Sequence, residues 1–138
     1  MNTVVLAASL LTGTALADEK QAEECVNTKV WDSYGDGWGV RTMTKTTLET
    51  GKTRNYLVTL YAGNEYRVQS CGDDSVTNLD VLLYDTEGNL LSRDDTESRE
   101  PMFSFTPKTT ATYYVVVYLR ELKEKRADAG VAMAVTYK

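Results

Sequence analysis

The chain contains no histidine, only two cysteines and only two prolines among its 138 residues. It therefore lacks the side chain that most often serves as a general base and as a zinc ligand. Catalytic systems of the Ser-His-Asp and Cys-His kinds are excluded within this chain. The missing histidine thus argues against most hydrolytic mechanisms and favours a protein that is not an enzyme.

Positive charge is also in short supply, because 15 Lys and Arg residues face 20 Asp and Glu residues and leave a net charge of −5. A surface of this sign repels the phosphates of nucleic acids and of anionic membranes. The sequence therefore predicts that nucleic acid is not a partner. The same excess leaves carboxylates that could bind cations.

The first 17 residues carry no charged side chain and are mostly apolar. They end in Ala15-Leu16-Ala17, the small-x-small pattern of a signal-peptidase site, and Asp18 follows at once. The apolar run is short for a membrane span, and no stop-transfer pattern follows it. We predict a signal peptide over residues 1–17 and an exported mature chain, periplasmic or extracellular, without an integral membrane segment. Because no Lys or Arg precedes the apolar run, a buried N-terminal helix or strand is the alternative.

The two cysteines, Cys25 and Cys71, both follow the predicted cleavage site. In an oxidising compartment they are expected to pair, whereas two free thiols are the alternative. The bond would close a loop of about 45 residues and contribute about 4 kcal/mol in the chain-entropy description.

Most of the chain after Cys25 alternates between apolar and polar residues, with the period of two that is typical of β-strands. The run at 113–119, YYVVVYL, is β-branched or aromatic throughout and is the clearest strand. The run at 79–85 is apolar on both faces, which predicts a central strand. Expected strands cover residues 26–32, 38–45, 56–60, 66–70, 79–85, 90–91, 102–106, 113–119 and 131–137.

The segments between these strands complete the predicted architecture. Residues 18–24 form a short acidic lead-in, and residues 25–138 form the domain. The one helix-like stretch, 121–130, is expected to be a long charged loop with at most two helical turns. About eight short strands with regular turn signals predict an all-β sandwich of the jelly-roll or Greek-key type after the signal peptide.

Six short motifs occur in a fixed order: NEYRV at 64–68, CGD at 71–73, NLDVLLYD at 78–85, GNL at 88–90, FTP at 105–107 and TYYVVV at 112–117. Together they resemble the bacterial pre-peptidase C-terminal (PPC) domain over about residues 56–137. That resemblance implies a jelly-roll-like sandwich, an accessory role in secretion or attachment and, as in some relatives, calcium binding. The chain departs from the pattern in having no peptidase domain and in having Ala111 where glycine is common.

The glycine-rich segment 32–39, DSYGDGWG, is the most unusual local feature. Asp32 and Asp36 could contribute to a calcium site, since calcium takes six to eight oxygen ligands. The segment is not an EF-hand, because Tyr34 stands at the third position and Met43 at the twelfth. The alternative is a connecting loop in which the aspartates cap turns and the aromatic residues pack.

A second acidic group supplies further candidate calcium ligands. Loops at one end of a sandwich meet, so the paired aspartates at 73–74 and 94–95 are expected to converge. Asp80 lies within a strand and needs a cation, backbone donors or an arginine such as Arg93 or Arg99. Ordinary hydrogen-bonded turns are the alternative, and Asp85 is assigned to such a turn. The predicted metal ligands are Asp32, Asp36, Asp73, Asp74, Asp80, Asp94 and Asp95.

Exposed aromatic side chains could form a binding site. Tyr34 and Trp38 are candidates for stacking on a sugar or a peptide, because a flat ring offers a large contact area at little entropic cost. The tyrosine-rich strand places Tyr114 and Tyr118 on one face. That face is either part of the core and its rim or a patch that binds a partner.

The sequence as a whole predicts an exported, non-catalytic binding or accessory module that recognises a protein or a polysaccharide. Calcium is the cofactor that its aspartates would hold. One alternative is a structural envelope protein that assembles with itself. The other is a small hydrolase that uses carboxylates, although their spacing gives no indication of a glycosidase.

Overall fold

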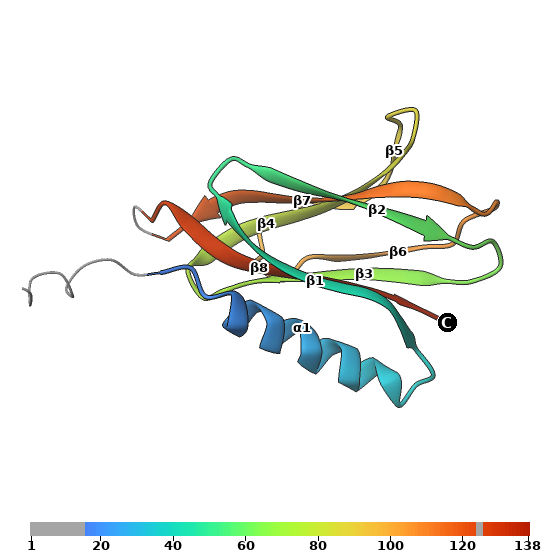
Figure 1. Ribbon diagram of the computed structural model, residues 1–138, viewed down its shortest axis with the longest axis horizontal. Coiled ribbons are helices and arrows are strands. Elements are labelled where there is room, and N and C mark those ends of the chain that lie inside the picture. The colour runs from blue at the N-terminus through green and yellow to red at the C-terminus, as the bar shows by residue number, and fades with distance from the viewer. Residues whose placement is uncertain (1–15, 124–125) are drawn as a thin grey trace, which may run out of the picture.

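The computed structural model describes residues 16–123 and 126–138, so most of the predicted signal peptide lies outside the described residues. The described chain folds into two four-stranded antiparallel sheets packed face to face, with one helix on the outside (Figure 1). The predicted all-β sandwich of about eight strands is confirmed. The elements are α1 (Glu19–Tyr34), β1 (Gly39–Glu49), β2 (Thr53–Leu60), β3 (Tyr66–Gly72), β4 (Val76–Asp85), β5 (Leu90–Asp94), β6 (Met102–Phe105), β7 (Ala111–Leu122) and β8 (Asp128–Tyr137).

The two sheets share one hydrophobic core. Sheet A has the order β1-β8-β3-β6, and sheet B has the order β2-β7-β4-β5. Strand β7 shows how the alternation builds the core, because Val115, Val117 and Leu119 are buried while the residues between them face outward. Opposite β7 on the same sheet, Val81 and Leu83 of β4 are also fully buried. Burying one such aliphatic side chain contributes roughly 1.5–3 kcal/mol.

Helix α1 corrects the predicted start of the domain. A strand was expected over 26–32, and this is wrong because the whole segment Glu19–Tyr34 is helical, including most of the predicted lead-in. The buried residues Ala22, Val26 and Val30 recur every four positions and form one apolar stripe. Asp18 caps the helix, since its carboxylate accepts a hydrogen bond from the Gln21 backbone nitrogen at 2.9 Å.

The stretch 121–130 also differs from expectation. Its two ends are strand, because β7 extends to Leu122 and β8 begins at Asp128. Residues 123, 126 and 127 between them lie outside the strands, and residues 124–125 lie outside the described part.

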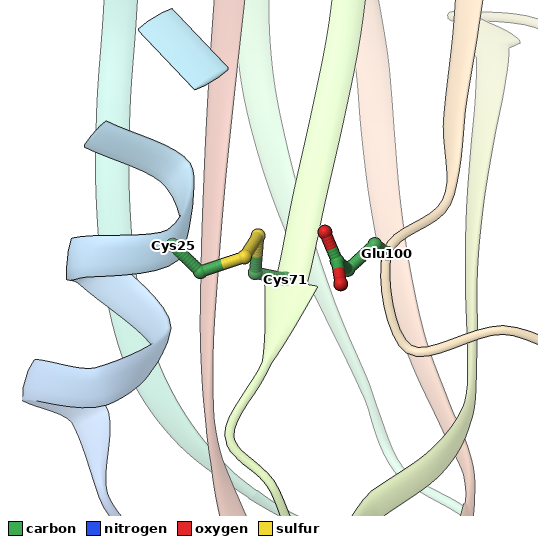
Figure 2. Close-up of side chains that lie close together, drawn as sticks. All are labelled: Cys25, Cys71 and Glu100. Atoms are coloured by element: carbon green, nitrogen blue, oxygen red, sulfur yellow. A yellow bond between two sulfur atoms is a disulfide. The ribbon is translucent and has the colours of Figure 1, made fainter. Parts of the chain in front are cut away.

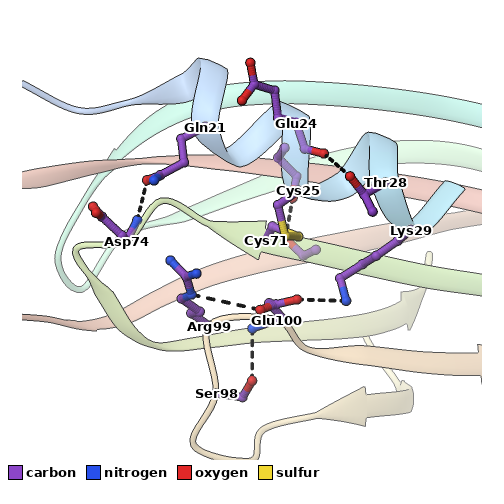
Figure 3. Close-up of a disulfide and its surroundings, with 12 residues drawn as sticks. Gln21, Glu24, Cys25, Thr28, Lys29, Cys71, Asp74, Ser98, Arg99 and Glu100 are labelled. Carbon is purple, nitrogen blue, oxygen red and sulfur yellow. Dashed lines mark hydrogen bonds and ion pairs between the residues drawn. A yellow bond between two sulfur atoms is a disulfide. The ribbon is translucent and has the colours of Figure 1, made fainter. Parts of the chain in front are cut away.

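Helix α1 lies across the outer face of sheet A and is bonded to it. The predicted disulfide is confirmed, and it joins Cys25 of α1 to Cys71 of β3 (Figure 2). The small residues Ala132 and Ala134 of β8 let the helix approach the sheet closely. Beside the disulfide, the Lys29 ammonium lies 2.8 Å from the Glu100 carboxylate (Figure 3).

The outer face of sheet B is bare by comparison. Figure 1 shows α1 on the side of sheet A only, and the helix contacts β1, β3 and β8, which all belong to that sheet. No helix in the described ranges is long and apolar enough to cross a membrane.

Candidate binding surface

The bare side of sheet B carries an apolar and aromatic surface. We call it the open face and define it by Leu57 of β2, Tyr114 and Val116 of β7, and Leu82 and Tyr84 of β4. The strand register places Leu57, Tyr114 and Tyr84 in one row and Val116 and Leu82 in the next. Leu57 is 64% exposed and Tyr114 is 38% exposed. Exposed apolar surface that is grouped in this way is typical of an interaction site.

A hollow of about 260 Å³ opens in this surface next to the β4–β5 turn. Two cross-strand tyrosines and one valine give it apolar walls, and polar groups from β2 and the turn complete it. Apolar walls with a few polar groups are common in binding sites. The residues around the hollow are Asn55, Tyr84, Asp85, Thr86, Gly88, Tyr114 and Val116.

The β4–β5 turn is a firm wall of the hollow. One oxygen of Asp85 accepts hydrogen bonds from the Glu87 and Asn89 backbone nitrogens, and the other accepts one from the Asn89 side-chain amide, each at 2.9 Å. The predicted turn-capping role of Asp85 is thereby confirmed. These hydrogen bonds lower the pKa of Asp85, and the bond from the Asn89 side chain has the largest effect. The carboxylate of Asp85 is therefore an anion at the edge of the hollow at neutral pH.

An ion pair between Asp80 and Arg120 lies on the same sheet beside the open face. Asp80 is buried, and one of its oxygens lies 3.5 Å from the Arg120 guanidinium. An arginine was one of the three kinds of partner expected for Asp80, and the arginine found is Arg120, not the suggested Arg93 or Arg99. Asp80 is opposite Tyr118 in the register, and Arg120 stands two residues further along β7 on the same face.

The surroundings of Asp80 disfavour its ionised form. Burial raises its pKa, the Arg120 charge opposes that rise, and the nearby Asp95 and Asp94 charges add to it. Its other carboxylate oxygen is buried and has no hydrogen-bond partner within the described ranges. Asp95 in turn pairs with Arg93 at 3.4 Å.

The predicted metal ligand Asp73 is occupied by protein donors. One of its oxygens accepts hydrogen bonds from the backbone nitrogens of Asp18 at 2.9 Å and Gly130 at 2.8 Å. The other accepts from the backbone nitrogen and the hydroxyl of Ser75. Burial alone would raise the pKa of Asp73, but these hydrogen bonds outweigh it and hold the pKa below 3.8.

Asp94 is also engaged by its surroundings. It accepts from the backbone nitrogen and hydroxyl of Thr96 at 3.0 and 2.6 Å, and from the Met102 backbone nitrogen at 3.0 Å. The last bond links the edge of sheet B to β6 of sheet A. Asp94 thus has the turn role that was the alternative to metal binding.

The remaining predicted ligands, Asp32, Asp36 and Asp74, are exposed. Among the described residues, the one group of three Cys, Asp or Glu side chains with ligand atoms within 4.8 Å of one another is Cys25, Cys71 and Glu100 (Figure 2). Its sulfur atoms are already joined as a disulfide, so this group is not a metal site. Calcium binding by the seven aspartates stays a prediction.

The predicted aromatic pair needs a correction. Tyr34 is 61% exposed, but Trp38 is buried under Arg67, whose guanidinium carbon is 4.0 Å from the centre of the indole ring. Trp38 follows the turn after α1 and is only 6% exposed. The exposed neighbour of Tyr34 is instead Trp31, with ring centres 5.5 Å apart. The two stand at i and i+3, so a correct helix prediction would have found them.

Comparison with known proteins supports the fold. No protein-family model matches the chain, and no curated protein matches its sequence. The solved structure of PliG from Aeromonas hydrophila, a periplasmic inhibitor of g-type lysozyme, is similar with a TM-score of 0.54 and 14% identity, over 70% of this chain and 85% of that one. The pre-peptidase C-terminal domain of a Bacillus anthracis collagenase is similar with a TM-score of 0.54 and 17% identity, over 70% of this chain and 90% of that one. The expected PPC-like sandwich is therefore confirmed.

Proposed function

We propose that this protein is an exported, non-catalytic module that binds another protein through the open face of sheet B. The observation that carries the proposal is the difference between the two sheets. The outer face of sheet A is covered by a helix that a disulfide holds in place, whereas Leu57 and Tyr114 expose apolar surface on sheet B. Tyrosine and apolar side chains around a hollow are what the centre of a protein interface usually offers.

The partner is a protein with a basic contact surface. The chain carries a net charge of −5, and the ionised Asp85 lines the hollow with Glu87 next to it in the turn. Opposite charge on the partner would speed its encounter with the open face and disfavour acidic competitors. A basic side chain with a long apolar stem could lie along the tyrosine rings and reach this acidic edge.

The similar structures supply a first partner to test. PliG inhibits g-type lysozyme, and the other similar structure is the pre-peptidase C-terminal domain of a collagenase. A shared fold does not by itself transfer a function. We therefore use g-type lysozyme as one probe and a set of secreted basic proteins as another, and measure both binding and inhibition of cell-wall lysis.

Matched variants make this measurement specific for the open face. Leu57→Asp and Tyr114→Ala change exposed side chains in the open face, whereas Tyr34→Ala removes an exposed tyrosine from α1. We expect the two open-face variants to weaken binding at least tenfold and the Tyr34→Ala control to bind like the unchanged protein. A partner that Tyr34→Ala alone releases would contradict the proposal. Insoluble polysaccharide serves as a second probe, and release of polysaccharide by Tyr34→Ala would favour the sugar-stacking alternative.

A further inference from the structure

The start of α1 is tied to a buried carboxylate far from the open face. Asp73 follows β3 and is 1% exposed. It binds the backbone nitrogen of Asp18, which lies 55 residues earlier in the chain. A second contact, from the Asp74 backbone nitrogen to the Gln21 side chain at 2.6 Å, holds the same end of the helix (Figure 3). This corner therefore fixes the position of the Asp18 nitrogen.

The carboxylate of Asp73 has no cationic partner in the described part of the chain. All of its donors there are neutral N–H and O–H groups, and none of the ion pairs there includes it. A buried anion is costly unless a positive charge or strong hydrogen bonds compensate it. The nitrogen that Asp73 binds is the one that the predicted signal-peptide cleavage would release.

We propose that cleavage between Ala17 and Asp18 converts this nitrogen into an α-ammonium group that forms a partly buried ion pair with the buried carboxylate of Asp73. A peptidase that processes exported chains breaks the peptide bond with one water molecule. The water oxygen goes to the new carboxyl group of Ala17, and the Asp18 nitrogen takes up protons to become an ammonium. Processing then completes the contact that holds α1 against sheet A. The inference rests on the predicted signal peptide and is independent of the proposed function.

The local geometry is compatible with this change. Leu16, two residues before Asp18, is 80% exposed, so no described element covers the approach of a peptidase to this residue. The Asp18 backbone lies against Gly130, where a Cβ atom would come within 2.4 Å of the Asp18 carbonyl group. Most charged residues on the elements around this corner are acidic, which favours a cation there: Asp18, Glu19 and Lys20 on the helix side, Lys45 and Glu49 on β1, Asp73 and Asp74 after β3, Lys123 after β7, and Asp128 on β8.

The test compares three forms of the chain with different N-termini. One begins with a free Asp18, one begins with an acetylated Asp18, and one retains Ala17. Each is made with Asp73, with Asp73→Asn and with Asp94→Asn as the matched control. We expect the free Asp18 form to melt several degrees higher than the other two, both in the unchanged protein and in Asp94→Asn. We expect this difference to disappear in Asp73→Asn.

Two outcomes would overturn the inference. One is an equal melting temperature for the free and acetylated forms, or a difference that survives in Asp73→Asn. The other is a mature exported protein whose N-terminus, read by mass spectrometry, is a residue other than Asp18. Should Asp73→Asn fail to fold, a second measurement tests the inference: the rate at which an acylating reagent modifies the α-amine of the unchanged protein. The ion pair should make this rate lower in the folded protein than in the denatured chain, and equal rates would overturn the inference.

Discussion

Cys25 near the middle of α1 is bonded to Cys71 of β3, with their Cα atoms 6.1 Å apart. This bond fastens the helix over the outer face of sheet A. The outer face of sheet B has no such cover in the part of the chain that the structure describes. Among the described residues, a helix therefore covers the outer face of sheet A, whereas no helix covers the outer face of sheet B.

Loss of the disulfide should destabilise the protein and loosen α1. The bond closes a loop with a sequence separation of 46, so Cys25→Ala with Cys71→Ala is expected to cost about 3–4 kcal/mol in free energy of unfolding. Urea unfolding measures the loss, and hydrogen exchange shows whether the amides of α1 lose most protection. Unchanged stability together with unchanged protection of α1 would contradict this account of the helix.

Asp73 should stabilise the fold through its hydrogen bonds and not through calcium. Asp73→Asn is expected to lower the free energy of unfolding by about 1–3 kcal/mol at pH 7, because a buried charged acceptor is lost. The pKa of Asp73 is lowered from 3.8, so its contribution is present above pH 3.8 and is lost as the pH falls through the lower folded-state value. The difference in free energy of unfolding between Asp73→Asn and the unchanged protein should therefore become smaller below pH 3.8.

Calcium provides the control for Asp73. The cost of Asp73→Asn should be the same in millimolar calcium and in chelator. A cost that appears only with calcium would show that Asp73 is a metal ligand after all. The melting temperature of the unchanged protein in the two solutions tests the wider calcium prediction for the other aspartates, and a rise with calcium would support it.

Arg120 should stabilise the fold, because its removal leaves the buried carboxylate of Asp80 without a positive partner. Arg120→Ala is expected to cost about 1–2 kcal/mol at pH 7, less than for a fully buried pair since Arg120 is half exposed. The pKa of Asp80 is already raised above 3.8 by burial, and loss of the arginine raises it further. Protonation then favours the folded state, so the cost should shrink as the pH falls toward 3.8.

A second substitution separates this mechanism from lost packing. Adding Asp80→Asn to Arg120→Ala removes the unpaired charge and should restore most of the lost stability at pH 7. Failure of the double variant to recover would mean that the packing of Arg120 over Tyr118, and not its charge, carries the effect. Thermal unfolding at pH 7 and pH 4 provides both readouts.

The protein should be a monomer in solution, with the open face exposed until a partner binds. Leu57→Asp replaces a largely exposed side chain and should change the free energy of unfolding by less than about 0.5 kcal/mol. Sedimentation should give the same molecular mass before and after this change. A dimer that Leu57→Asp dissociates would instead support the self-assembling alternative.

The sandwich was predictable because its strands each bury one face, so that residues such as Val115 and Val117 leave a period of two in the sequence. The disulfide was predictable because Cys25 and Cys71 both follow the predicted signal peptide, which indicates an oxidising compartment. Helix α1 was not, because the spacing of Val26 and Val30 fits the same face of a strand as well as that of a helix.

The site depended on contacts that cross long stretches of chain. Arg120 of β7 reaches Asp80 of the neighbouring strand β4, and only the register of these two strands places them together. Likewise, the sequence shows that Tyr114 and Tyr118 share a strand face but not whether another element covers it. Only the structure shows that α1 covers sheet A and not the side of sheet B that carries Tyr114.

The most direct test of the central claim is capture of a partner from the exported fraction of the producing cells by immobilised protein. Four baits are compared: the unchanged chain, Leu57→Asp, Tyr114→Ala and the Tyr34→Ala control. The account predicts that one basic protein is retained by the unchanged chain and by Tyr34→Ala, and that it binds at least tenfold more weakly to the other two when purified. A purified partner that binds all four baits with equal affinity would contradict it.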